Sequence, residues 1–118
     1  MPMPIYQQLN GTSTGTAVIL DWAVVPFNAS FALELQNGTG QFGVQYTLDD
    51  PNAAIDGLTT STTVTWFNDA NASPSSNSNS TTGNYLFPVR ALRVQVNSAS
   101  NTGTFQMQFA VLQGLPNY

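Results

Sequence analysis

The chain lacks cysteine, histidine and lysine, and it has few charges of either sign. Its 118 residues include two arginines and six acidic residues, so 7% of residues are charged whereas 42% are hydrophobic. A soluble domain usually devotes about a quarter of its residues to charge. The missing residue types exclude disulfides, thiolate metal sites, and catalysis by imidazole or a lysine amine. The solvent-exposed surface must therefore be formed mainly by Ser, Thr, Asn and Gln. A neutral polar surface of this kind suits a protein of an assembly better than an enzyme.

Basic residues are too scarce for a polyanionic partner. The net charge is −4 and the pI is near 4.1, and the only cations are Arg90 and Arg93. Neutralising phosphates requires clustered Lys and Arg, so we expect neither nucleic acid nor a membrane as a partner. The first residues lack the basic and apolar regions of a secretory signal. We expect a soluble protein that is made in the cytoplasm and forms a single folded domain.

Alternation of apolar and polar residues dominates the chain. Residues 31–35, 42–48 and 105–109 each place apolar side chains on one face of a strand. Gly- and Asn-rich turns separate these runs, and residues 35–41 are the strongest hairpin signal. No window has a helical stripe. The pattern predicts an all-β fold, an antiparallel, jelly-roll-like β-sandwich of about seven to eight strands.

Two segments differ from this pattern. Residues 1–14 contain two prolines and little apolar content, which favours an extended N-terminal arm laid over a neighbour rather than a strand of the chain's own sheet. Residues 15–118 form the single sandwich domain. Within it, the Ser- and Asn-rich stretch 68–84 has no large apolar residue to anchor it, so we expect a long exposed loop. It is either flexible in solvent or ordered by a neighbouring subunit or target.

Two strands have unusual faces. Residues 16–27 are apolar on both faces, so either a loop or the arm of the same subunit covers the outer one, or another chain does. In residues 86–96 the apolar face changes sides near Arg90, which predicts a bulge or bend. An inward Arg90 would need a structural ion pair with Asp49 or Asp50. Arg93 lies on the polar face and is either a solubilising or an interface charge.

The acidic cluster of Asp49, Asp50 and Asp56 has three interpretations. The segment has turn chemistry, in which Asp caps backbone donors and proline sets the bend. Oxygen ligands at short spacing also suit Ca²⁺, although the EF-hand pattern is absent. A pair of carboxylates is the minimum for a glycosidase. We favour the turn, and expect no catalytic residue, no metal ligand and no cofactor.

The aromatic residues also have two interpretations. Trp22, Trp66, Tyr46 and Tyr85 are able to stack on sugar rings beside neutral hydrogen-bonding side chains, as in a lectin. Most of them lie on apolar faces, so the core is the favoured interpretation. Tyr6 and Tyr118 lie near the two ends of the chain and are better placed to contact a partner.

Several short motifs carry a resemblance to a known family. They are Val-Gln-Tyr-Thr-Leu-Asp-Asp-Pro at 44–51, Thr-Trp-Phe-Asn at 65–68, Phe-Pro-Val-Arg-Ala-Leu-Arg at 87–93, and a closing strand from Gly-Thr-Phe at 103–105 to Leu-Gln-Gly at 112–114. The chain resembles the small β-sandwich head decoration or cement proteins of tailed bacteriophages. The resemblance implies a non-enzymatic virion protein on the capsid surface that bridges subunits of the major capsid protein and self-associates as a dimer or trimer.

Two alternatives to this function stay open. The first is a receptor- or carbohydrate-binding module of a phage tail or fibre, and the second is a carboxylate-based hydrolase. For the capsid function, the interface residues are expected in the arm, the doubly apolar strand, the polar sheet face and the C-terminus. They are Met3, Ile5, Tyr6, Ile19, Val25, Phe27, Arg93 and Tyr118.

Overall fold

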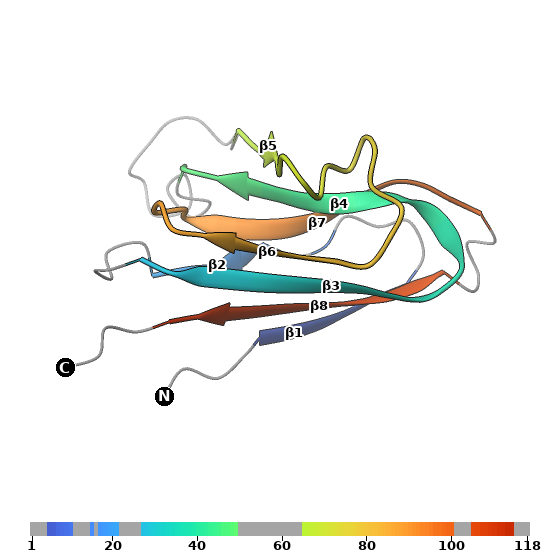
Figure 1. Cartoon of the computed structure of the whole chain (residues 1–118), viewed down its shortest axis with the longest axis horizontal. Helices are drawn as coiled ribbons and strands as arrows, with labels where there is room; N and C mark the ends of the chain where they lie inside the picture. Colours follow the sequence, from blue (N-terminus) through green and yellow to red (C-terminus); the bar gives the residue numbers. More distant parts are fainter. Residues whose placement is uncertain are drawn as a thin grey trace, which may run out of the picture.

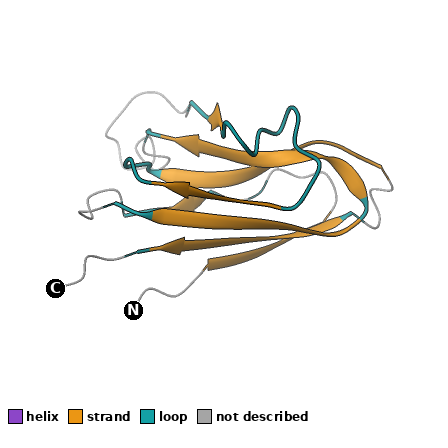
Figure 2. Ribbon diagram, in the orientation of Figure 1, coloured by secondary structure: helices purple, strands orange, loops and turns teal. Residues whose placement is uncertain are grey.

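The computed structural model describes residues 5–10, 15, 17–21, 27–49, 65–100 and 105–114, and this part of the chain is built from strands without helices (Figure 2). It accordingly holds no helix long and apolar enough to cross a membrane. The strands are β1 (Ile5–Asn10), β2 (Val18–Ile19), β3 (Ala29–Asn37), β4 (Thr39–Thr47), β5 (Phe67–Asn68), β6 (Thr81–Tyr85), β7 (Ala91–Ser100) and β8 (Gln106–Gln113).

The strands form two four-stranded antiparallel sheets packed as layers (Figure 1). Sheet A has the order β1-β8-β3-β6, and sheet B has the order β2-β7-β4-β5. Pairing is nested, because β1 pairs with β8, β2 with β7, β3 with β6 and β4 with β5. This is the order of a jelly roll, in which one long hairpin is wrapped into two sheets. The predicted fold class is confirmed.

The period-2 pattern sets the core. Phe31 and Leu33 of β3 alternate with exposed residues, and their inward side chains meet those of β4, β7 and β8 between the sheets. The largest fully buried side chains are Phe42, Phe105, Phe109, Leu33, Leu92 and Met107. Burying apolar surface contributes about 25 cal/mol per Å². In a chain without disulfides, this packing is the main source of stability.

The connection at Gly38 joins the two sheets. The prediction of a hairpin across residues 35–41 is wrong, because β3 pairs with β6 and β8 whereas β4 pairs with β5 and β7. Gly38 has a φ of 88°, and a Cβ there would lie 3.1 Å from Phe105. The turn was identified correctly, but alternation on both sides of a turn does not distinguish a hairpin from a corner between two sheets.

The N-terminal segment belongs to sheet A. Residues 5–10 form β1, which pairs with β8 from Ile5 opposite Val111 to Asn10 opposite Gln106. The prediction of an arm outside the sheet is therefore wrong for these residues, while 1–4 and 11–14 lie outside the described part of the chain. Leu9 explains the difference, because it faces inward and packs against the core.

The segment after β5 closes the edge of β4 (Figure 1). The amide of Val44 donates to the carbonyl of Ala72 at 2.8 Å, and the amide of Phe42 donates to that of Asn77 at 3.0 Å. Ala72 and Pro74 are fully buried. The prediction of an exposed loop is wrong for this portion of 68–84, because the chain's own sandwich orders it. The residues of this segment that contact β4 have small side chains, so a pattern of large hydrophobic residues does not predict that the segment is ordered.

The expected change of face near Arg90 is present. Ala91 and Leu92 are consecutive and both fully buried, so they fill opposite faces where β7 begins. The chain bends at Phe87 and Arg90, before the strand. The register shift of β7 itself lies further along, where Gln41 pairs with Ser98 and Phe42 with Val96.

Gly43 offers a test of the closed edge. A Cβ at this position would collide with the carbonyl oxygen of Ala72 and the backbone of Pro74. We expect Gly43→Ala to lower the free energy of unfolding by about 1–3 kcal/mol or more, because backbone must move. Gly114→Ala is the control, since its nearest neighbour is the Asn28 carbonyl oxygen at 3.5 Å. Urea unfolding measures both, and equal stability of the two variants would contradict the close approach.

Candidate functional site

The structure places the predicted interface residues unevenly. Ile5, Tyr6 and Ile19 are exposed by 47%, 61% and 49%. Phe27 is buried in the core, with 6% of its surface exposed, so its assignment to an interface is corrected: it fills the sandwich interior. Met3, Val25 and Tyr118, with Trp22, lie outside the described residues.

Arg93 is held against the outer face of sheet B. Its Nε donates to Oε1 of Gln45 at 2.9 Å, and its guanidinium carbon lies 4.3 Å from the centre of the Trp66 ring. Burial lowers the pKa of Arg93 from its usual value. Arg93 is thus half-buried and engaged within the chain, and Trp66 covers it from outside the core.

Arg90 and Asp49 take part in backbone connections. The amide of Arg90 donates to the carbonyl of Thr47, and its own carbonyl accepts from Leu20, both at 2.9 Å. The exposed carboxylate of Asp49 accepts from the amide of Thr65 at 2.9 Å, sixteen residues further along the chain. Asp50 and Asp56 lie outside the described residues, so the ion pair of Arg90 with Asp49 or Asp50 stays a prediction, and the turn stays the favoured interpretation of this segment over a calcium site.

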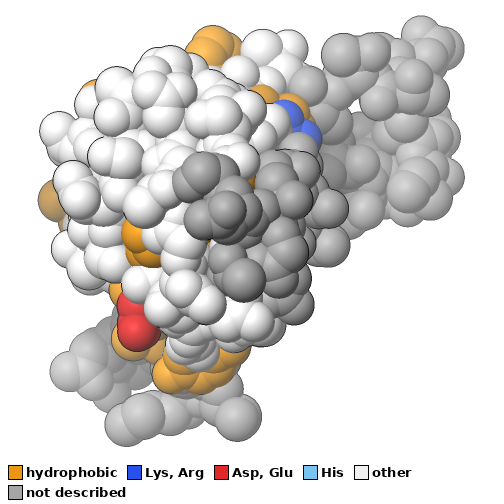
Figure 3. All heavy atoms as spheres, turned by 90° about the vertical axis from the view of Figure 1, so that its right-hand side faces the viewer, with side chains coloured by type: hydrophobic (Ala, Val, Ile, Leu, Met, Phe, Trp, Pro, Cys, Tyr) orange, Lys and Arg blue, Asp and Glu red, His pale blue; other side chains and the backbone are white. Residues whose placement is uncertain are grey.

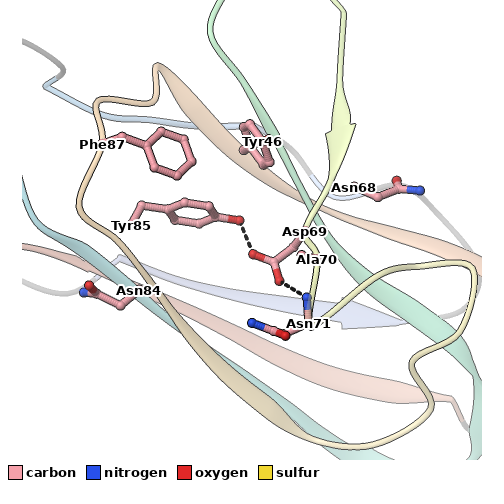
Figure 4. A pocket seen from close by; sticks show the side chains of 8 residues that line it. All are labelled: Tyr46, Asn68, Asp69, Ala70, Asn71, Asn84, Tyr85 and Phe87. Atoms are coloured by element: carbon pink, nitrogen blue, oxygen red, sulfur yellow. Dashed lines mark hydrogen bonds between the residues drawn. The ribbon is translucent and has the colours of Figure 1, made fainter.

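A partly open pocket lies where the edges of the two sheets meet (Figure 4). Its volume is about 260 Å³. One side is formed by the end of β6 and the residues after it, and the other by β5 and the turn that follows. The lining residues are Tyr46, Asn68, Asp69, Ala70, Asn71, Asn84, Tyr85 and Phe87.

Asp69 connects the two sides of this pocket. Its Oδ1 accepts from the amides of Asn71 and Ala72 at 2.9 and 2.8 Å, which fixes the turn after β5. Its Oδ2 accepts from the hydroxyl of Tyr85 on β6. Its amide donates to the carbonyl of Val44 at 2.9 Å. Asp69 therefore links the edge of sheet A and the turn through charge-assisted hydrogen bonds of its carboxylate, and it joins β4 through a backbone hydrogen bond.

Three aromatic rings line the pocket, those of Tyr46, Tyr85 and Phe87, and a fourth ring packs behind Tyr46. Tyr46 stacks on Phe67 with centroids 5.8 Å apart, and its ring centre lies 5.5 Å from that of Tyr85. Phe87 meets Tyr46 and Tyr85 edge-on at 5.8 and 5.6 Å. Phe67 and Phe87 are half-exposed, whereas Tyr85 is buried. The aromatic cluster thus contains a buried ring, that of Tyr85, and the exposed ring surfaces of Phe67 and Phe87.

The described lining of the pocket combines aromatic rings with hydrogen-bonding side chains. No Lys, Arg or His lines it, and the described residues contain no group of three or more His, Cys, Asp or Glu able to hold a metal ion. Its one carboxylate already accepts three hydrogen bonds within the chain. Tyr46 and Tyr85 were among the aromatic residues for which sugar stacking was the alternative to the favoured core interpretation. Asp69 and Asn71 were missed because they begin a run of small polar residues with no apolar pattern, although an Asp two residues before an Asn is a turn signal.

The link between Asp69 and Tyr85 can be measured by a double-mutant cycle. We expect Asp69→Asn to lower the free energy of unfolding by about 1–3 kcal/mol and Tyr85→Phe by about 1 kcal/mol. Their combination should cost less than the sum, because both remove the same hydrogen bond. Glu34→Gln is the control, since Glu34 is exposed on β3. Additive losses in urea unfolding would contradict the link.

Tyr85 also predicts a pH dependence. Burial, and then the hydrogen bond to Asp69, raise the pKa of Tyr85 above its ordinary value of 10.0. Above that pH the unfolded chain loses this proton while the folded chain keeps it, so stability is full below pH 10 and falls as the pH rises. The slope from this one group is at most about 1.4 kcal/mol per pH unit. Urea unfolding from about pH 9 to 11.5 should show a flatter decline for Tyr85→Phe, and parallel curves would refute the assignment.

A scan against protein-family models finds no match for this chain, and comparisons with curated proteins and with solved structures find none either. The resemblance to phage decoration proteins therefore rests on the short sequence motifs alone, and the functions that it implies stay predictions.

Proposed function

We propose that this chain is a non-enzymatic virion structural protein that decorates a phage capsid and bridges subunits of the major capsid protein. The outer face of sheet A is the observation that supports the proposal most directly. This face is formed by the outward-pointing alternate residues of four adjacent strands, most of which are polar. Glu34 is the only charge among the described residues of this face. The exposed side chains are Tyr6, Gln8, Ala32, Glu34, Gln36, Thr82, Asn84, Gln106 and Leu112.

This face suits a contact that covers it. Gln8 donates to Gln36 at 2.8 Å, so its amides are already ordered across strands. Tyr6 and Leu112, exposed by 61% and 47%, supply apolar anchors. Covering uncharged amides and hydroxyls avoids the cost of burying ions. At the end of the sandwich that faces the viewer in Figure 3, most of the described surface consists of uncharged polar side chains and backbone.

The two outer faces differ in a way that favours sheet A as the contact surface. On sheet B, Trp66 covers Arg93, and the chain at 72–74 passes over Gly43. Ala91 and Thr47 on that face are fully buried. Sheet A keeps its outer face exposed. Weak contacts of this kind become tight when a protein is repeated many times on one particle, and self-association as a dimer or trimer adds to this effect.

A second function, as a receptor- or carbohydrate-binding module of a phage tail or fibre, is favoured by the pocket beside Phe87. Jelly rolls serve both as capsid proteins and as lectins, so the fold supports either function. Apart from Asn84, which borders both, the pocket and the outer face of sheet A are formed by different residues, which allows the two functions to be tested separately.

The capsid function is tested on purified particles of the virus that encodes the chain. We expect quantitative mass spectrometry to find hundreds of copies per particle, whereas a few dozen would indicate a tail protein and none would overturn the proposal.

The role of the outer face of sheet A is tested by a charge variant. Ala32→Arg places a charge in the row Tyr6–Ala110–Ala32, and we expect at least tenfold weaker attachment to shells. Ser78→Arg, in the exposed loop before β6, should attach normally, and equal binding of both variants would contradict the role of this face.

A further inference from the structure

We propose that the pocket between β5 and β6 binds a single neutral sugar ring of a glycan, with Phe87 as the stacking surface and Asn71 as the main hydrogen-bonding group. This inference goes beyond capsid attachment and holds whether the chain serves in a head or a tail, because it concerns a different surface. It assigns a ligand class to the tail-module alternative.

The size of the pocket limits the ligand. Its volume of about 260 Å³ lies just below the range of about 300–1,000 Å³ that is typical of small-molecule sites. One ring-sized group fits such a space, whereas a nucleotide or an extended oligomer does not. The pocket is partly open, so further sugar units of a glycan have room to extend into solvent.

Aromatic surface supplies the apolar side of the site. Phe87 is half-exposed, and its edge-on contacts with Tyr46 and Tyr85 fix its orientation. The C–H face of a sugar ring is apolar and packs on such a ring, while its hydroxyls remain at the edge. The tyrosines are themselves held, because Tyr85 is tied to Asp69. The stacking surface is therefore formed before any ligand arrives.

Polar groups supply the other side. The side chain of Asn71 points into the space between the strands, whereas those of Asn68 and Asn84 point away (Figure 4). Asn84 is occupied by Asn28 and Ser30, and Asn68 accepts from Gln45. The backbone of Asn71 is fixed by Asp69 at 2.9 Å. The side-chain amide of Asn71 offers a hydrogen-bond donor and an acceptor together, and a sugar hydroxyl is able to use both.

Charge decides among ligand classes. An anionic ligand such as a phosphate, or an acidic sugar, would face the carboxylate of Asp69 with no cation in the lining. A cationic ligand would find the same carboxylate already accepting three hydrogen bonds. A proline-rich peptide also packs on aromatic rings, but it needs an extended groove rather than one ring-sized pocket. A neutral sugar satisfies the rings and the amide together.

The test is a titration of ¹⁵N-labelled protein with neutral monosaccharides: glucose, galactose, mannose and N-acetylglucosamine. For at least one of them we expect amide shifts at 69–71 and 84–87, with a Kd on the order of millimolar. Phe87→Ala and Asn71→Ala should each weaken that Kd at least tenfold. Their matched controls, Leu86→Ala and Asn79→Ala, remove an exposed neighbour and an exposed loop asparagine, and should bind as the parent does.

Several outcomes would overturn the proposal. They are the absence of shifts with all four sugars, shifts confined to another surface, or equal loss of binding in the controls. Binding of a polyproline peptide at the same amides without sugar binding would reassign the pocket. Thermal unfolding of every variant shows whether it is folded, and Asn71→Ala keeps the test decisive if Phe87→Ala unfolds. Attachment to shells is measured separately, so failure of sugar binding leaves the capsid proposal unaffected.

Discussion

The hydrogen bonds of Asp69 are the constraint on which the rest of the site depends. A β-strand at a sheet edge exposes unpaired amides, and β5 covers only two residues of β4. The carboxylate of Asp69 fixes the turn that brings the carbonyl of Ala72 to the amide of Val44. Its bond to Tyr85 joins the same turn to sheet A. Edge closure and the shape of the pocket therefore follow from one side chain.

This closure gives the molecule two unlike surfaces. The outer face of sheet B is covered in part by its own chain, from Trp66 over Arg93 to Pro74 near Gly43, whereas Ile19 stays exposed. Sheet A presents exposed glutamines and small residues with Glu34 as the described charge. The small number of charged residues in the sequence therefore leaves the described outer face of sheet A almost uncharged. An open neutral face and a separate aromatic pocket are compatible with a virion protein that packs through one surface and binds a ligand through another.

The sequence predicted the sandwich because alternation is local: Phe31 and Leu33 follow the pattern that their burial requires. It failed where partners are distant in the chain. The turn at Gly38 looks the same in a hairpin and a corner, and Leu9 gives too short a signal to place β1. For the site, Tyr46 and Tyr85 were identified by residue type. Asp69 and Asn71 were not, since their roles depend on a β6 strand that begins ten residues after Asn71.

Hydrogen exchange at the amides of Phe42 and Val44 tests the central claim most directly. Both amides point to the segment after β5 and donate to Asn77 and Ala72. The closed edge predicts that they exchange as slowly as amides inside β7, and that Asp69→Asn speeds up both, because the turn loosens. Exchange at the rate of an open sheet edge in the parent protein would contradict the account.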